Sequence, residues 1–239
     1  MRGISSLDYE KFVYLQKNLI NFIYYKMRIF LFTFYFFTLM TVSCQSNVQT
    51  YTIETNLGNI QVKLYDKTPL HKENFERLVA EHFYDGVLFH RIIPGFMIQT
   101  GNGATKVTPD ENEIDLNYTV PAEFVPEYFH KRGALAAARM GDAVNPEKRS
   151  SPTQFYIVQG RTYSDEELDQ IEKQLQIQFS EFQRGVYKTI GGTPFLDQNY
   201  TVFGEVVKGL EVVDAIASIP TGRGDFPEKD IRILRIVKN

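Results

Sequence analysis

Residues 89–101 read Phe-His-Arg-Ile-Ile-Pro-Gly-Phe-Met-Ile-Gln-Thr-Gly, two short apolar runs around a central Pro-Gly pair. This pattern predicts two strands that meet at a turn. Beyond the turn, Phe96 and Met97 are large and apolar, and Gln99 can both donate and accept hydrogen bonds. An arginine such as Arg91 beside two apolar side chains and an amide is typical of a groove that binds peptides, although an arginine on a strand often simply points into solvent.

The first of these two strands is expected to present two different faces, because successive side chains of a strand point to opposite sides. Phe89, Arg91 and Ile93 would then share one face, and His90 and Ile92 the other.

The same strand signal recurs along the chain. It covers residues 51–55, 60–65, 87–93, 96–99, 133–137, 154–158, 200–203 and 230–237. Two helices are predicted besides: one opens with Thr68 as its cap and Pro69 in its first turn, and one lies within residues 207–219, before Pro220. Many strands with only two core-forming helices predict a mainly β protein, a closed barrel capped at both ends.

One segment, residues 161–193, breaks this pattern. Ser164 and Glu167 form a capping box, and apolar residues follow at steps of three or four up to Val186. This spacing predicts one inserted amphipathic helix of about six turns. Two interpretations are open: a helix that only pads the barrel, or an arm that binds clients or partners.

Five motifs follow one another along the chain: residues 89–99, Gly-Ala-Leu-Ala-Ala-Ala at 133–138, Thr-Gln-Phe-Tyr-Ile at 153–157, Phe-Leu-Asp at 195–197 and Tyr-Thr-Val-Phe-Gly at 200–204. In the order and spacing of these motifs, the chain resembles the cyclophilin family over residues 51–238, apart from the insertion. The resemblance implies an eight-stranded antiparallel barrel with two capping helices.

The resemblance also implies a set of site residues, with Arg91 as the catalytic arginine. The peptide-binding residues it implies are His90, Phe96, Met97, Gln99, Ala138, Arg139, Gln154, Tyr156, Phe195, Leu196 and Tyr200. Among them, Phe96, Met97 and Leu196 would line a proline pocket, and the two glutamines would hydrogen-bond the peptide backbone.

Four of these residues depart from the usual family pattern. Tyr156 stands where the family usually has Phe, and Phe195 where it has Trp; Arg139 and Tyr200 replace an Asn and a His of eukaryotic members. The changes at 195 and 200 resemble bacterial cyclophilins. They predict weak binding of cyclosporin, while isomerisation is retained.

The activity that the resemblance implies is peptidyl-prolyl cis–trans isomerisation, which would assist the folding of exported proteins. Rotation about an X-Pro bond makes no new bond, so we expect no cofactor and no metal. The clients would be polypeptides that contain proline. The alternative is a peptide-binding module or holdase chaperone that uses the same barrel without catalysis; a structural membrane protein is a more distant alternative, because no further hydrophobic run of spanning length follows Val42.

Composition and charge argue against one further class of function, nucleic-acid binding. Hydrophobic residues make up 43% and charged residues 23% of the 239 residues, as in ordinary globular proteins. Residues 1–43 carry five basic and two acidic side chains, a net +3, which leaves −6 for the remainder of a chain whose total is −3. An acidic domain argues against nucleic-acid binding. We expect a monomer.

The N-terminal segment predicts export and anchoring. Residues 29–42 are uncharged but too short to span a bilayer, which needs about 20 residues, and they fit the hydrophobic region of a signal peptide. Met27 and Arg28 precede this region, and Cys44, the only cysteine, follows Ser43. The arrangement resembles a bacterial lipoprotein signal, in which the cysteine is lipidated. An ordinary cleaved signal and an uncleaved anchor are the alternatives.

These features give the expected domain organisation. Residues 1–26 would be an upstream extension of the gene model, 27–43 the signal peptide, 44–50 a tether and 51–239 the isomerase domain. The protein would be anchored in the bacterial cell envelope and face the periplasm.

Overall fold

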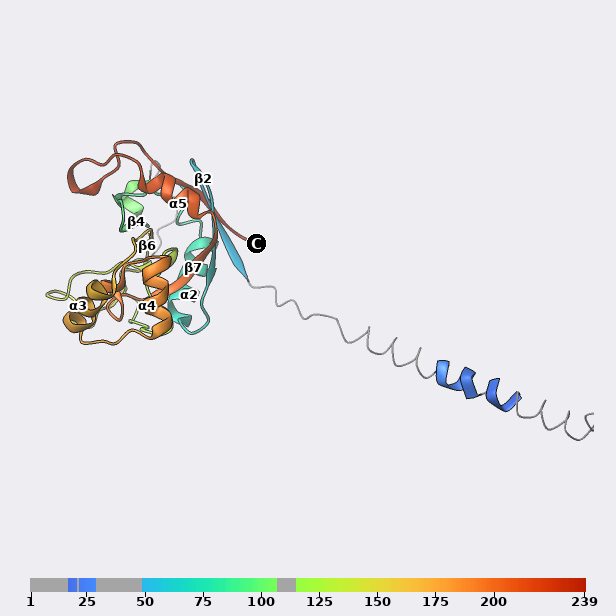
Figure 1. The fold of residues 1–239 in the computed structure, drawn as a ribbon. Helices are drawn as coiled ribbons and strands as arrows, with labels where there is room; N and C mark the ends of the chain where they lie inside the picture. The colour runs from blue at the N-terminus through green and yellow to red at the C-terminus, as the bar shows by residue number, and fades with distance from the viewer. Residues whose placement is uncertain (1–16, 21, 29–48, 107–114) are drawn as a thin grey trace, which may run out of the picture. The chain divides into compact units, whose positions relative to one another are not determined.

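The computed structural model describes residues 17–20, 22–28, 49–106 and 115–239 (Figure 1). The chain separates into two units, Met1–Asn47 and Val48–Asn239. Of the first unit, residues 17–20 and 22–28 are helical. The predicted signal region at 29–42 and Cys44 lie outside the described residues. In the parts of the chain that the structure describes, no helix combines the length and apolarity needed to cross a membrane.

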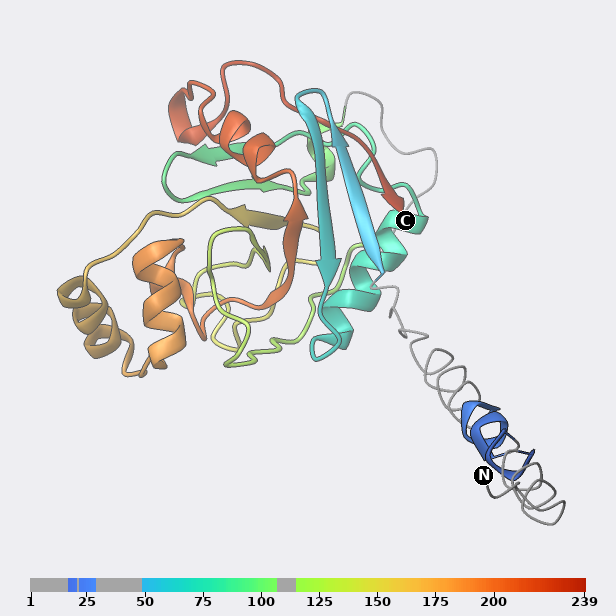
Figure 2. The same cartoon turned by 45° about the vertical axis from the view of Figure 1, so that its right-hand side comes forward.

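The second unit is built on one eight-stranded antiparallel sheet (Figures 1 and 2). Its strands are β1 (Thr50–Thr55), β2 (Gly58–Leu64), β3 (Arg91–Ile93), β4 (Met97–Thr100), β5 (Ala134–Ala137), β6 (Phe155–Val158), β7 (Val202–Lys208) and β8 (Ile233–Lys238). Their spatial order is β3-β4-β6-β5-β7-β2-β1-β8. Each predicted strand segment overlaps one of these strands, so the mainly β class and the eight antiparallel strands are confirmed.

The prediction of a closed barrel is wrong in one respect, because the sheet is a half-barrel with β3 and β8 as its edges. The segments that precede these two strands meet at an isolated antiparallel bridge between Leu88 and Arg232. Beside it, the backbone N–H of Phe89 donates to the carbonyl of Ile231 at 2.8 Å. β3, three residues long, pairs with β4, and no ladder joins it to β8 among the described strands.

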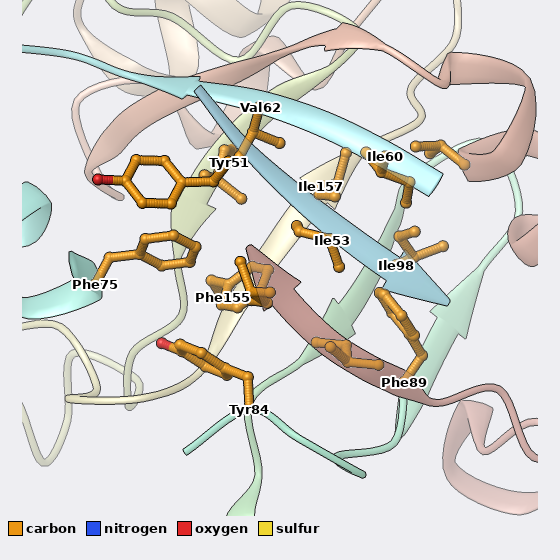
Figure 3. Close-up of a cluster of buried hydrophobic side chains, with 14 of the residues drawn as sticks. Tyr51, Ile53, Ile60, Val62, Phe75, Tyr84, Phe89, Ile98, Phe155 and Ile157 are labelled. Carbon is orange, nitrogen blue, oxygen red and sulfur yellow. The ribbon is translucent and has the colours of Figure 1, made fainter. Parts of the chain in front are cut away.

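The interior of the half-barrel is apolar and aromatic, as Figure 3 shows. Its labelled side chains are all at most 2% exposed: Tyr51, Ile53, Ile60, Val62, Phe75, Tyr84, Phe89, Ile98, Phe155 and Ile157. The ring of Phe75 lies 5.7 Å from that of Phe155, edge to face, and 5.5 Å from that of Tyr84. Such aromatic pairs add stability beyond the area they bury. The sheet that carries the groove described below therefore rests on a tightly packed support.

Two helices seal this interior, as predicted. α2 (Pro69–Ala80) contributes Leu78 as well as Phe75, and α5 (Leu210–Ala217) contributes Val213 and Ile216.

The start of α2 departs from the prediction in its cap. Thr68 occupies the N-cap position, but its side chain makes no cap hydrogen bond. The carboxylate of Glu123 instead accepts from the backbone N–H groups of Leu70 and His71 at 3.1 and 3.0 Å. A carboxylate at a helix N-terminus satisfies free N–H groups and favours the helix dipole. Leu70 is exposed, because the buried face of α2 is formed by His71, Phe75 and Leu78.

The inserted segment forms two helices where a single one was predicted: α3 (Asp165–Leu175) and α4 (Glu181–Thr189), which lie side by side in Figure 2. The predicted capping box of Ser164 and Glu167 begins α3. α3 ends where Gln176 takes a left-handed conformation, with φ 56° and ψ 39°. A second capping box, formed by Ser180 and Gln183, then starts α4.

Candidate active site

A cavity of about 240 Å³ opens on the outer face of the half-barrel. Its lining residues are Arg91, Phe96, Met97, Gln99, Ala138, Arg139, Tyr156, Leu196 and Tyr200. All nine belong to the set predicted from sequence. The remaining three predicted residues, His90, Gln154 and Phe195, contact members of the lining, as described below.

Strand register explains why residues far apart in sequence meet here. Arg91 of β3 pairs with Gln99 of β4, Gln99 with Tyr156 of β6, and Tyr156 with Ala136 of β5. Directly paired residues lie on the same face of a sheet. These four positions therefore form one row across the outer face. In the neighbouring row, Ile92 pairs with Ile98 and Ile98 pairs with Ile157, and this row points into the core.

The predicted alternation fails at the start of this region. Arg91 and Ile93 do share the outer face, but Phe89 lies in the core together with Ile92. His90 reaches the outer face, where it contacts Gln99. The alternation breaks because β3 begins only at Arg91. Before that residue the chain follows the isolated bridge, and the period of two no longer applies.

Arg91 is held at one point, which leaves most of its guanidinium open to the cavity. Its Nε donates to Oδ2 of Asp225 at 3.1 Å, and each of the two side chains is 43% exposed. Asp225 ends the short 3₁₀ helix Arg223–Asp225 and has a left-handed φ of 62°. Sequence reasoning missed this residue, because a single aspartate in a loop carries no local signal of its partner.

Two glutamines and a histidine form the polar side of the site. Gln99 donates from Nε2 to Oε1 of Gln154 at 3.0 Å, and the same nitrogen lies 3.4 Å from Nε2 of His90. Burial lowers the pKa of His90, so its ring is neutral and can accept a hydrogen bond. The predicted residues His90, Gln99 and Gln154 therefore form one connected group.

Phe96 and Phe195 form an aromatic wall. The chain reaches Phe96 through a turn in which Gly95 has a φ of 71°, a conformation that glycine adopts without strain. The backbone N–H groups of Gln159 and Gly160 both donate to the carbonyl of Phe96 at 3.0 Å. The ring of Phe195 packs 5.5 Å from that of Phe96. Phe195 therefore supports the rim of the cavity from outside.

The opposite wall is cationic and aromatic. The guanidinium carbon of Arg139 lies 4.5 Å from the centre of the Tyr200 ring. Arg139 also donates from Nε to the carbonyl of Asn199 at 2.7 Å and pairs with Asp142 at 2.5 Å. Its side chain is buried, so these contacts fix its position.

A second histidine cluster has the carboxylate, imidazole and hydroxyl of a hydrolase triad in the same order, but it is buried. His71 contacts Oε2 of Glu123 through Nδ1 at 2.6 Å and Oγ of Ser150 through Nε2 at 2.9 Å. His71 and Ser150 are at most 3% exposed, so no substrate can reach them. The cluster joins α2 to the segment around Ser150. Within the described ranges, no group of three or more His, Cys, Asp or Glu side chains is placed to hold a metal ion.

The half-barrel and the groove on its outer face define a β protein with a cavity that joins an arginine to an apolar pocket. Comparison with known proteins identifies the family. Residues 50–238 match the family model described as cyclophilin type peptidyl-prolyl cis-trans isomerase/CLD. The chain belongs to this family.

Individual relatives agree with this assignment. A peptidyl-prolyl cis-trans isomerase of Acinetobacter baylyi is 31% identical over 77% of this chain and 82% of its own length. A putative bifunctional phosphatase/peptidyl-prolyl cis-trans isomerase of Streptococcus pyogenes is 36% identical over 76% of this chain, which covers only 37% of that longer protein. The crystal structure of a Cryptosporidium parvum cyclophilin type isomerase, 24% identical, shares the fold with a TM-score of 0.59 over 80% of this chain and 97% of that one.

Proposed function

We propose that this protein catalyses cis–trans isomerisation of X-Pro bonds in polypeptides. The observation that carries the proposal is the position of Arg91, whose guanidinium lines the same cavity as the apolar side chains of Phe96, Met97 and Leu196. A proline ring is apolar, and the amide that precedes it is polar. A cavity with both characters suits an X-Pro unit. The isomerase names of the curated relatives support the same activity.

In this proposal Arg91 is the catalytic residue. The barrier to rotation, about 18–20 kcal/mol, comes from amide resonance. As the amide twists, the prolyl nitrogen gains electron density, and a guanidinium N–H donates to it more strongly than in the planar ground state. An interaction that strengthens only in the transition state raises the rate. With Nε held by Asp225, the two terminal nitrogens remain to make this contact.

The other residues of the site would bind and orient the peptide. Phe96, Met97 and Leu196 would hold the proline ring, so that only the preceding residue rotates. Gln99 and Gln154 would bond the peptide backbone. The remaining walls would be formed by Ala138, Arg139, Tyr156 and Tyr200. His90 and Phe195 would support the site through their contacts with Gln99 and Phe96.

A prolyl-peptide isomerisation assay on purified Arg91 variants tests the proposal. Arg91→Ala is expected to lower kcat/KM by about 10²-fold or more, by analogy with removal of one oxyanion-type donor. Its melting temperature should stay close to that of the wild type, because the Asp225 pair is exposed. Arg91→Lys should recover only part of the activity, since a point charge does not reproduce the planar guanidinium.

Phe96→Ala serves as the comparison variant. It removes a pocket wall, so it should weaken peptide binding as well as the rate, whereas Arg91→Ala should act mainly on the rate. Wild-type activity in a folded Arg91→Ala variant would refute the catalytic role of Arg91. Peptide binding without turnover in the wild-type protein would favour the second candidate, a peptide-binding module or holdase that does not catalyse.

We also propose that Cys44 is lipidated and anchors the domain in the bacterial cell envelope, facing the periplasm. The uncharged run at 29–42 before Ser43 and Cys44 supports this proposal. Cys44→Ser should release the protein from membranes or leave an uncleaved precursor. Intact-mass analysis of the native protein is the direct measurement, and an unmodified Cys44 would contradict the proposal.

A further inference from the structure

A chain of buried hydrogen bonds connects the inserted helices to the wall of the cavity. Tyr187 of α4 donates its hydroxyl to Oδ2 of Asp197 at 2.6 Å. Oδ1 of the same carboxylate accepts from Nδ1 of His130 at 2.7 Å and from the His130 backbone N–H at 2.8 Å. Nε2 of His130 lies 3.0 Å from the hydroxyl of Tyr156, which lines the cavity. Four side chains thus run from the insertion to the groove.

All four of these side chains are buried. Tyr187, Asp197, His130 and Tyr156 are each at most 4% exposed. Burial raises the pKa values of Tyr156 and Tyr187 well above the ordinary range, so both hydroxyls keep their protons and act as donors. If His130 carries its proton on Nδ1, its Nε2 accepts from Tyr156, and every donor in the chain has an acceptor.

A chain of this kind holds its members in place, because a buried polar group that loses its partner costs more free energy than the bond itself contributes. The ring of Tyr156 therefore cannot shift without breaking its bond to His130. Asp197 directly follows Leu196, another lining residue, at the end of the 3₁₀ helix Pro194–Leu196. The hydrogen-bonded chain therefore positions two lining residues together: Tyr156, which bonds to His130, and Leu196, which precedes Asp197.

The Tyr187 end of this chain of hydrogen bonds is equally fixed. The Tyr187 ring packs edge to face against Phe129 at 5.4 Å, Phe179 at 5.4 Å and Tyr163 at 6.5 Å. These residues belong to a separate apolar cluster, which the insertion forms together with Phe129. Arg184 ties α4 to α3 through Glu172 and Asp169, both at 2.8 Å. A displacement of the helix pair would therefore reach Asp197 directly.

We propose that Tyr187, Asp197 and His130 are positioning residues of the groove, through which the inserted helices set the shape of the proline-binding wall. The insertion thereby determines how tightly the groove holds a proline-containing peptide. This inference rests on the proposed function only for the identity of the ligand. Its measured quantity is peptide affinity, which is defined whether or not the protein catalyses.

The test compares three tyrosine-to-phenylalanine variants in the intact protein. Tyr187→Phe and Tyr156→Phe each break the chain at one end and leave both rings in place. Tyr163→Phe is the matched control, because Tyr163 lies in the same cluster outside the chain. The Kd of the peptide Ala-Ala-Pro-Phe is measured by calorimetry, and kcat and KM by an NMR exchange assay.

Tyr187→Phe and Tyr156→Phe are each expected to weaken binding about three- to tenfold and to raise KM with little change in kcat. The double variant should resemble either single variant, because a chain that is already broken has little more to lose. Tyr163→Phe should bind as the wild type does. Wild-type affinity in Tyr187→Phe, or losses that simply add in the double variant, would overturn the proposal.

A second measurement needs no variant, and so stays decisive if Tyr187→Phe does not fold. Coupling between two sites is reciprocal, so peptide bound at the groove must also affect α4. Peptide binding to the wild type should shift the NMR signals of the Tyr187 ring and the His130 imidazole. Unchanged signals at saturating peptide would refute the coupling. A protein that binds peptide and shows these shifts without turnover would refute the proposed catalysis while leaving this inference standing.

Discussion

The contact between Arg91 and Asp225 gives a prediction whose size follows from the structure. Asp225→Asn removes the charge and keeps nearly the same shape. Asparagine also tolerates the left-handed φ of 62° at this position, whereas alanine would add backbone strain. The variant therefore tests the ion pair and spares the turn.

The exposure of the pair limits the expected effect. With 3.1 Å between Nε and Oδ2 and 43% of each side chain exposed, the pair contributes at most about 1 kcal/mol. If all of this energy serves to orient Arg91 in the transition state, kcat/KM falls about fivefold. The free energy of unfolding should fall by no more than about 1 kcal/mol, the upper limit for an exposed ion pair.

The assay is prolyl-peptide isomerisation at ionic strengths of about 0.02 and 0.5 M. Salt screens exposed charges, so the difference between Asp225→Asn and the wild type should shrink at the higher value. Asp230→Asn is the matched control: it removes a carboxylate nearby in sequence, one that pairs with Arg232 at 2.6 Å. A loss above about 50-fold, or none at low salt, would show that the pair does not act by orienting Arg91.

Two further predictions concern pH and an inhibitor. Burial lowers the pKa values of His71 and His90, so the unfolded chain binds protons first on acidification; the free energy of unfolding should be fully retained above pH about 6.5 and fall below it. In denaturant titrations between pH 7.5 and 5.5, the free energy of unfolding should fall less in His71→Gln than in the wild type. The same fall in both proteins would exclude His71 as a source of the pH dependence. Cyclosporin should bind weakly because Phe195 has no indole N–H, and Phe195→Trp should improve its Kd about fivefold in a fluorescence titration. Equal Kd values in the two proteins would reject the missing donor as the cause.

The row of residues that lines the cavity could be predicted from sequence because a motif carries it. The stretch from Phe89 to Gly101 contains Arg91, Phe96, Met97 and Gln99, and the structure brings all four to the same cavity. Short-range patterns of this kind specify strands and turns directly.

The apolar spacing of the insertion did not reveal that the segment forms two helices. The steps of three and four from Leu168 to Val186 continue across a break, because Leu168 of α3 and Val186 of α4 belong to the same apolar cluster. Phe182, which also fits the steps, is 71% exposed. Ser180 and Gln183 are a readable second capping box and could have revealed the break. The left-handed Gln176 could not, since glutamine shows no preference for that conformation.

The contacts that hold the site in place had no local signal at all. Asp225 reaches Arg91 over 134 residues, and His130 reaches Asp197 over 67. Each lies in a loop whose course depends on the packing of the whole domain. Only tertiary structure pairs such residues, so sequence reasoning found the lining of the groove and missed its supports.

The position of β1 has a mechanical consequence. The chain enters the domain at Thr50 and continues directly into β1, which pairs with β2 on one side and β8 on the other. Antiparallel hydrogen bonds lie perpendicular to the strands, so a pull on the entering chain loads both ladders in shear. Many bonds then resist together, where peeling would break them one by one. With the proposed anchor at Cys44, a force on a polypeptide bound to the domain would act on β1, a strand that is hydrogen-bonded along both edges.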